Sequence, residues 1–332
     1  MSAPCFALHA TRLLALPVMG AMTMLAALPA AAQPEAYPRK PVTIVVAYPP
    51  GGSTDLTGRT LAAELSKKLG VPVVIENIGG AAGAIGAQKV VNAAPDGYTL
   101  LVGANNEIAI NRLVSSSVKY DIKDFTPLGL IASQPLVLVA SQKSGVKTVD
   151  QFLSLVKQNP GKFSYGSSGV GSSLHLAGEM VKEQAGLFMT HIPYRGVAPL
   201  TNDLLGNNID FGVYVLSSAL PHIRSGKLVP LGTTELKRSA VTPDIPALAE
   251  TPKLKGIDIG TWYVLMGPAR MPAPVVAKLK KALSDSLQSP ELRKKLEDAS
   301  STIAPLNVDM PRFLGTEIAK YKKIVDFAKI TE

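Results

Sequence analysis

One segment near the start of the chain decides the fold: residues 42–70 read VTIVVAYPPGGSTDLTGRTLAAELSKKLG. Its first part, residues 42–47, is a run of β-branched and small apolar residues, which is typical of a buried strand. After a turn rich in Pro and Gly, apolar residues recur at helical spacing from residue 56 to 69, and Gly70 is a helix-ending residue. A strand followed by a helix is the first half of a βαβ unit, so the segment predicts a parallel sheet covered by helices.

The alternation of strand-like and helix-like residues continues along the chain. Residues 71–76 and 99–102 are strand-like, residues 84–93 follow a helical pattern, and Pro95-Asp96-Gly97 makes a tight return before the third strand. A second series begins near Pro135, with predicted strands at 136–140, 163–166, 190–194 and 209–215 and predicted helices at 148–158, 174–184 and 199–205. After a strand at 262–266 we expect only helices, at 274–287, 291–299 and 311–330.

The two series predict two α/β domains, each a mostly parallel sheet flanked by helices. Helices without a sheet of their own must pack on another one, so we expect the final helices to return to the first domain. The chain then crosses near residues 135 and 258, which assigns residues 33–134 and 259–332 to domain 1 and residues 135–258 to domain 2. A cleft between the domains, lined by loops at the carboxyl ends of strands, is where such sheets bind ligands.

The composition is that of a globular protein held together by packing. Of 332 residues, 46% are hydrophobic and 18% are charged, which excludes a disordered chain. A single cysteine excludes a disulfide framework and a multi-thiolate zinc site. The net charge is +9, but the basic clusters at 278–281 and 293–295 lie in helical patterns without a nucleic-acid-binding motif. We therefore expect no nucleic-acid partner, although a positive field raises the encounter rate with small anions.

The first 32 residues have the pattern of a cleaved signal peptide. Arg12 supplies a positive start, residues 13–28 are apolar, and Ala30-Ala31-Ala32 matches a cleavage site before Gln33. A membrane anchor is the alternative, but the apolar run contains Pro17 and is shorter than the about 20 residues that a span needs. We therefore expect an exported chain, without Cys5.

Two strand-to-helix loops of the first domain have compositions suited to an anion. Residues 48–55, YPPGGSTD, open a helix, whose N-terminus offers unpaired N–H groups and the positive end of its dipole. The loop lacks the lysine of a Walker A motif. In the alternative view Ser53 or Thr54 caps the helix and Asp55 complements its dipole. In the second loop, residues 77–86 (NIGGAAGAIG), the glycines serve helix packing as readily as ligand approach.

A third loop, residues 166–173 (GSSGVGSS), forms a neutral cradle rich in hydrogen-bond donors at the start of a helix in the second domain. Arg195 follows another strand of that domain and is suited either to clamping a carboxylate or to tying its loop to a backbone carbonyl. An exported hydrolase would need Ser172 or Ser173 with His175, but the Gly-x-Ser-x-Gly motif is absent and a packing or capping role for His175 is favoured. His175, His191 and His222 are not spaced as metal ligands, so no metal is expected.

Taken in order, the motifs of the chain resemble those of the Bug (TctC-type) extracytoplasmic solute-binding receptors of tripartite tricarboxylate transporters. The matching segments cover essentially the whole exported chain: residues 48–55, 76–86, 94–100 (APDGYTL), 120–121 (YD) with 124–127 (DFTP), 159–161 (NPG), 165–175, 193–196 (PYRG) and 203–206 (DLLG). The resemblance implies a periplasmic binding protein with a type 2-like Venus-flytrap fold. Such a receptor closes its two domains over a small carboxylate and delivers it to a membrane permease.

The resemblance also implies where the ligand binds. The expected ligand-binding residues are Tyr48, Gly51, Gly52, Ser53, Thr54, Asp55, Asn77, Ser167, Ser168, Gly169, Gly171, Ser172, Ser173 and Arg195. We expect the protein to be a monomer that needs no cofactor. The sequence departs from the usual pattern at Pro50, at Ile78 and at residues 105–107 (NNE), so the ligand itself stays open. An orphan receptor that presents its ligand to a membrane sensor is the alternative function.

Overall fold

A computed structural model describes residues 37–239 and 241–331 of the chain. The predicted export segment lies outside the described residues. Residues 37–332 form one compact unit, so the proposed boundaries between two domains stay a prediction.

The described residues form a ten-stranded sheet in which two parallel trios are joined by long antiparallel strands. In the first trio β1 pairs with β2 and β3, and in the second β5 pairs with β6 and β7. The strands are β1 (Val42–Val46), β2 (Val73–Asn77), β3 (Thr99–Ala104), β4 (Phe125–Ser141), β5 (Ser164–Ser167), β6 (Thr190–Pro193), β7 (Phe211–Val215), β8 (Leu228–Thr233), β9 (Gly260–Pro268) and β10 (Thr302–Ile303).

Strand β4 runs through both halves of the sheet. Over residues 125–135 it pairs with β9, and over residues 136–141 it pairs with β7 and β8. The sequence predicted only residues 136–140 as a strand. Pro127 and Gly129, residue types typical of turns, lie at a shift of register, where a bulge tolerates a proline.

The prediction that no strand follows residue 266 was wrong. The two residues of β10 pair with Ser133 and Ala132 of β4, and so short a strand has no periodicity to read. Strand β8 and helix α7 were also not predicted, because Pro230, Gly232 and Pro221 lie inside them.

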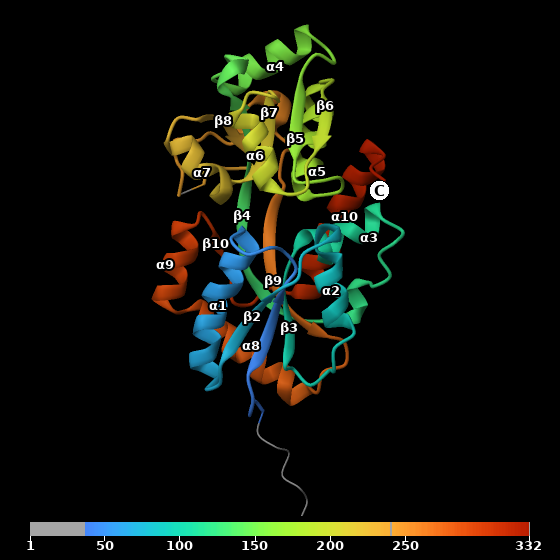
Figure 1. Cartoon of the computed structure of the whole chain (residues 1–332), viewed down its shortest axis with the longest axis vertical. Coiled ribbons are helices and arrows are strands. Elements are labelled where there is room, and N and C mark those ends of the chain that lie inside the picture. The colour runs from blue at the N-terminus through green and yellow to red at the C-terminus, as the bar shows by residue number, and fades with distance from the viewer. Residues whose placement is uncertain (1–36, 240, 332) are drawn as a thin grey trace, which may run out of the picture. The chain divides into compact units, whose positions relative to one another are not determined.

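Helices cover both trios, as expected. Figure 1 shows α1, α2, α8 and α9 around the first trio and α4 to α7 around the second. The helices are α1 (Ser53–Leu69), α2 (Ala84–Val91), α3 (Asn111–Val114), α4 (Val149–Gln158), α5 (Ser173–Ala185), α6 (Val197–Leu205), α7 (Leu216–Arg224), α8 (Ala273–Leu287), α9 (Pro290–Asp298) and α10 (Met310–Ala328). A π-helical turn η2 (Asn106–Ile110) and the 3-10 turns η1 (Ala81–Gly83), η3 (Ile122–Asp124), η4 (Gln142–Ser144), η5 (Leu248–Glu250) and η6 (Pro252–Leu254) complete the set.

The ends of two helices confirm their sequence signals. Gly70 ends α1 in the left-handed conformation, with φ 72°. The Thr148 side chain caps α4 by accepting a hydrogen bond from Gln151 N at 3.2 Å. Inside α1, Gly58 allows the helix to approach β1, since a Cβ there would lie 2.8 Å from Val46 Cγ2.

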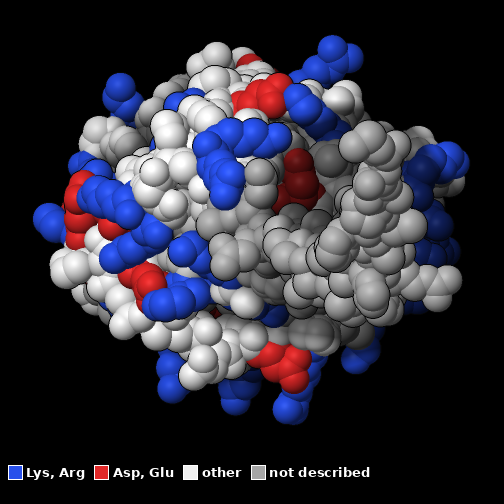
Figure 2. Space-filling view, turned by 90° about the horizontal axis from the view of Figure 1, so that it is seen from below, with Lys and Arg blue, Asp and Glu red and all other residues white. Residues whose placement is uncertain are grey.

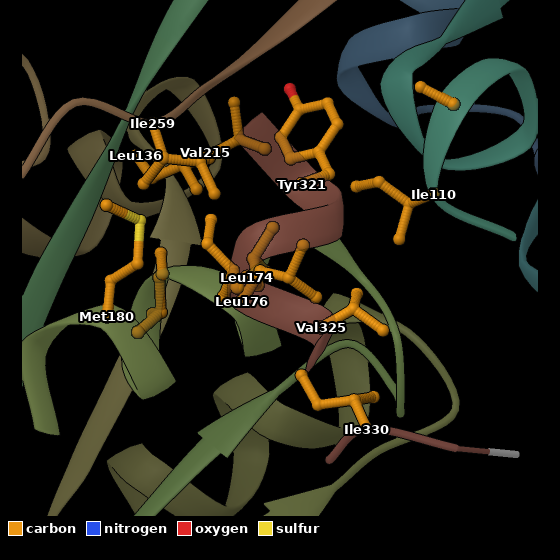
Figure 3. Packing of buried hydrophobic residues seen from close by; sticks show 14 of the residues in the cluster. Ile110, Leu136, Leu174, Leu176, Met180, Val215, Ile259, Tyr321, Val325 and Ile330 are labelled. Atoms are coloured by element: carbon orange, nitrogen blue, oxygen red, sulfur yellow. The ribbon is translucent and has the colours of Figure 1, made fainter. Parts of the chain in front are cut away.

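The C-terminal helix α10 packs on both halves of the molecule, the first built around β1, β2 and β3 and the second around β5, β6 and β7. It contacts η2 and α3 beside the first trio, as expected of a final helix, but it also contacts α5 beside the second. Tyr321 and Val325 of α10 lie between Ile110 and the α5 residues Leu174 and Leu176 in one buried apolar cluster (Figure 3). The hydrophobic core is therefore continuous from one half to the other on this side.

The positive charge is not gathered in one patch. Figure 2 shows Lys and Arg spread over the visible face, with Asp and Glu among them. In the predicted basic clusters of α8 and α9, three lysines form i,i+4 ion pairs, Lys281 with Asp285, Lys294 with Asp298 and Lys295 with Glu291. These clusters are solvated helix faces.

Candidate ligand site between two helix-opening loops

Asp55 holds the loop that opens α1. Its Oδ2 accepts hydrogen bonds from Gly51 N at 2.9 Å and Arg59 Nε at 3.0 Å, and its Oδ1 accepts from Asn77 Nδ2 at 2.8 Å. Burial opposes the charged form, but these three bonds together hold the pKa of Asp55 below its usual value. Asp55 therefore stays ionised, and its hydrogen bonds fix the shape of its loop.

Asn77, at the end of β2, supports the same loop. Its Nδ2 also donates to Tyr48 O at 3.0 Å, and its Oδ1 accepts from Arg59 Nη2 at 2.9 Å. Both polar ends of the side chain thus have protein partners. The structure brings Asp55 and Asn77 together, and their hydrogen bonds support the loop before α1.

The N-terminus of α1 has no side-chain cap. The N-cap residue is Gly52, so neither Ser53 nor Thr54 caps the helix. The first helical bond runs from Leu56 N to Gly52 O at 2.9 Å, which leaves the preceding N–H groups without an acceptor in the helix. A Cβ at Gly51 or Gly52 would meet no heavy atom within 4 Å. Uncapped N–H groups beside open space are what a carboxylate needs.

Behind this loop lies a buried carboxyl that the sequence marked only as a departure from the family. Tyr48 Oη donates to Glu107 Oε2 at 2.6 Å, and Ala104 N donates to Glu107 Oε1 at 2.6 Å. Glu107 is only 1% exposed, and burial raises its pKa to about 7 despite these bonds. A Cβ at Gly83 would lie 3.0 Å from Glu107 Oε2, so this glycine of the second loop serves close packing.

The third loop reaches the first through the residue beside Glu107. Asn106 Oδ1 accepts a hydrogen bond from Ser173 N, in the first turn of α5, at 3.0 Å. Ser173 Oγ lies 3.4 Å from Thr261 Oγ1 on β9. A continuous path thus runs from Tyr48 through residues 106–107 to α5. The first loop and the start of α5 thus both contact this turn.

Ser172 and Ser167 shape the third loop. Ser172 caps α5, since its Oγ accepts from His175 N at 3.2 Å and donates to Gly169 O at 2.8 Å. Ser167 Oγ lies 3.2 Å from Gly169 N and 2.7 Å from His191 Nε2. Both serines are at most 2% exposed.

The remaining residues of the third loop lie nearer to solvent or to the other half. Ser168 and Gly169 are half-buried. Gly171 has φ +70°, and a Cβ there would lie 2.6 Å from Val114 Cγ2 of α3. Gly171 is therefore required where the loop meets the first half of the molecule.

The ring of His175 is not placed to activate a serine. Its Nδ1 accepts from Gly171 N at 3.2 Å, and the ring stacks on His191 with centroids 3.7 Å apart. Burial lowers the pKa of both imidazoles, that of His175 to about 4. Among residues 37–239 and 241–331 no hydrogen bond joins the His175 ring to the hydroxyl of Ser172 or Ser173, as the hydrolase alternative requires.

Arg195 stands apart from these networks. It is exposed on the loop between β6 and α6, and it forms no ion pair or hydrogen bond with any residue that the structure describes. The neighbouring N-cap of α6, Gly196, has no side-chain cap and faces open space. The structure therefore does not show Arg195 tied to a backbone carbonyl.

Among residues 37–239 and 241–331, no three His, Cys, Asp or Glu residues lie together as metal ligands would. No described helix combines the length and the apolar character that crossing a membrane requires.

Comparisons with known proteins agree with the motifs. A family model described as the tripartite tricarboxylate transporter family receptor matches residues 57–330. Protein BugT of Bordetella pertussis is 31% identical over 321 residues, which cover 96% of this chain and 98% of BugT.

Two solved structures with bound carboxylates are similar. R. palustris Rpa4515 with adipate has a TM-score of 0.83 at 32% identity, covering 89% of this chain and 99% of that one. MatC from Rhodopseudomonas palustris with bound malate has a TM-score of 0.78 at 30% identity, covering 87% of this chain and 100% of that one. These similarities confirm the predicted α/β fold of periplasmic binding proteins. The chain belongs to the receptor family of the tripartite tricarboxylate transporters.

Proposed function

We propose that the protein binds a small carboxylate between the loop before α1 and the loop before α5, and delivers it in the periplasm to a transporter permease. The observation that carries this proposal is the uncapped N-terminus of α1, which faces open space at Gly51 and Gly52. The carboxylates bound to Rpa4515 and MatC, relatives of the same fold, support it.

The described contacts divide the predicted site residues into two roles. Asp55, Asn77, Ser167 and Ser172 hold the loops, because their polar atoms already have partners. The N–H groups at residues 52–54 and the half-buried Ser168 remain to meet the ligand. An anion held by neutral N–H groups does not require a buried opposite charge, whose desolvation is costly.

Arg195 and Tyr48 complete the proposed site. Arg195 is an exposed cation without a described partner, so it would meet the outer end of a ligand with two acidic groups. Tyr48 is half-buried at the base of the first loop. Its ring would then form the floor beneath the ligand.

Binding would close the two halves about β4 and β9. Strand β4 changes partners between Pro135 and Leu136, and β9 begins at Gly260, whose Cβ position lies 2.9 Å from Gln134 O. The proposed hinge therefore lies at the crossings predicted near residues 135 and 258, which stay a prediction. The ligand favours the closed form only through contacts that both halves make at once.

The substitution Gly52→Asp tests the proposed cradle. Residue 52 has φ −81° and ψ 172°, which suits an aspartate N-cap, so the helix should be as stable as before or slightly more so. A fixed carboxylate at the cap would occupy the N–H groups and repel the ligand. Isothermal titration with mono-, di- and tricarboxylates should show affinity reduced by at least about tenfold.

Two variants control this experiment. Gly52→Asn places an uncharged side chain of similar shape at the same cap. Gly315→Asp adds the same charge at an exposed glycine of α10 that also has open space around it. Full affinity in Gly52→Asp would remove the α1 N-terminus from the site, and no binding of any carboxylate by the unchanged protein would refute the function.

Delivery to a permease needs a cellular test. Cells lacking this protein should lose uptake of the ligand found by titration, and the unchanged gene should restore uptake while the Gly52→Asp gene should not. Normal uptake in the deletion strain would instead favour the sensor alternative.

A further inference from the structure

Glu107 is a buried acidic residue that the proposed binding mechanism has not yet used. It lies in η2, directly after Asn106, whose side chain accepts a hydrogen bond from Ser173 N of α5. The carboxyl group of Glu107 accepts a hydrogen bond from Tyr48 at the base of the first loop. Gly83 of the second loop packs on the same carboxyl. The first two loops thus meet at this side chain, and α5 bonds the residue next to it.

No cation balances this carboxyl among the described residues. The titratable groups that interact with it are three tyrosines, Tyr48 before α1, Tyr120 before η3 and Tyr263 on β9. Burial raises the pKa of each tyrosine, so all three are neutral near pH 7. Tyr48 Oη and Ala104 N donate to the two oxygens of Glu107, and a carboxylate can accept more.

The carboxyl lies close to the proposed anion cradle. Tyr48, whose Oη donates to Glu107 Oε2 at 2.6 Å, belongs to the same loop as Gly51 and Gly52. A ligand held by the start of α1 would therefore bind beside an acidic group with no counter-charge. The electrostatic field of Glu107 repels a negatively charged group of a ligand and attracts a positively charged one.

We propose that Glu107 determines the specificity of the site: it disfavours a ligand with a second carboxylate and favours a monocarboxylate that carries an ammonium group. This inference rests on the proposed function. A second negative charge on the ligand would be repelled in a site of low dielectric constant, whereas an ammonium group would supply the missing counter-charge.

The same carboxyl links specificity to pH. Its pKa of about 7 means that it is half protonated near neutral pH. A nearby dianion raises that pKa further, so a dicarboxylate binds better as the pH falls and Glu107 takes up a proton. An ammonium ligand has the opposite dependence, because it needs the charged form.

Glu107→Gln separates the charge from the packing. The amide oxygen can still accept from Ala104 N, and the amide nitrogen can donate to Tyr48 Oη, which then turns to donate to Ala82 O, now 3.4 Å away. Glu64→Gln is the matched control. It removes another buried carboxylate, 5% exposed, in the second half of α1 and paired with Lys67.

The probes are matched pairs of ligands in which one carboxylate is exchanged for an ammonium group. Succinate, glutarate and adipate are compared by isothermal titration with 3-aminopropanoate, 4-aminobutanoate and 5-aminopentanoate, at pH 6 and pH 8. At pH 8 the unchanged protein should prefer the amino acid of a pair. Glu107→Gln should shift that preference by roughly tenfold toward the dicarboxylate.

The pH dependence of dicarboxylate affinity gives a second test. Dicarboxylate affinity of the unchanged protein should rise several-fold from pH 8 to pH 6, with a limit of about tenfold for each pH unit for one proton. Glu107→Gln should be flat over this range and Glu64→Gln should behave as the unchanged protein.

The outcomes separate this inference from the proposed function. If no carboxylate binds the unchanged protein at either pH, the proposed function fails and this inference fails with it. If carboxylates bind, but their affinity does not depend on pH and Glu107→Gln leaves the preference within each pair unchanged, only the role of Glu107 is overturned.

Discussion

Asn106 Oδ1 accepts a hydrogen bond from Ser173 N at 3.0 Å, and this bond joins the turn after β3 to the N-terminus of α5. The two residues are far apart in the sequence and belong to opposite halves of the molecule. The asparagine oxygen thus serves as the acceptor for one of the N–H groups at the start of α5, which have no acceptor within the helix. The position of α5 against the first half depends in part on this single acceptor.

We expect Asn106→Ala to loosen the contact between the turn after β3 and α5. Ser173 N would lose its acceptor, at a cost of roughly 1 kcal/mol, so open forms should become more populated. Small-angle X-ray scattering of the ligand-free protein should report a larger radius of gyration, and ligand affinity should fall several-fold. Asn92→Ala, which alters an asparagine at the end of α2, is the control. An unchanged radius in Asn106→Ala would show that the bond does not hold the halves together.

Gly171→Ala should hinder the approach of the two halves. The added Cβ would lie 2.6 Å from Val114 Cγ2. Affinity for the ligand should fall by at least about tenfold, because the closed form becomes strained. Gly186→Ala is a matched control, since its φ of +62° carries similar backbone strain while a Cβ there meets no heavy atom within 4 Å.

A second substitution tests the cause of that loss. Val114→Ala removes the methyl groups that the new Cβ would meet, so it should restore much of the affinity of Gly171→Ala. No rescue would mean that backbone strain at the positive φ, rather than the clash, weakens binding.

The sequence predicted the parts of the site that are local. β-branched residues followed by glycines and hydroxyl residues at a helix start are short-range signals, and they placed the loops before α1 and α5 correctly. It could not show which residues contact a ligand and which hold the loop. Asp55 and Asn77 have the polarity of ligand-binding residues, and only their hydrogen bonds to each other and to Arg59 reveal a bracing role.

Long-range contacts were outside the reach of sequence patterns. The bond between Asn106 and Ser173 depends on how the two halves pack, and the environment of Glu107 depends on two separate loops. The first half of β4 was missed for a different reason. Its prolines and glycine are turn signals that the bulged pairing with β9 accommodates.

The stacked imidazoles should make the protein sensitive to acid. Burial holds the pKa of His175, at about 4, and that of His191 below the usual 6.5. Their contribution to stability is therefore complete above pH 6.5, where the unfolded imidazoles are also neutral, and is lost as the pH falls toward 4. At pH 5 the loss should be about 2 kcal/mol for each imidazole, measured by urea unfolding.

His175→Asn should reduce this sensitivity. The asparagine oxygen can replace Nδ1 as acceptor for Gly171 N, and it does not titrate. The difference in unfolding free energy between pH 7 and pH 5 should shrink by about 2 kcal/mol. His222→Asn, on α7 and outside the stacked pair, is the control. An equal difference in His175→Asn and the unchanged protein would locate the acid sensitivity elsewhere.

Glu107 should affect stability in the opposite pH direction. Burial raises its pKa from 4.5 to about 7, so the folded protein holds a proton that the unfolded chain releases between these values. Stability from this group is complete below pH 4.5 and is lost as the pH rises through 7, by roughly 3 kcal/mol in total. Relative to Glu107→Gln, the unchanged protein should therefore lose unfolding free energy from pH 5 to pH 8. Because the comparison is made at each pH, the histidine contribution cancels, and a constant difference would mean that Glu107 ionises as an ordinary exposed glutamate does.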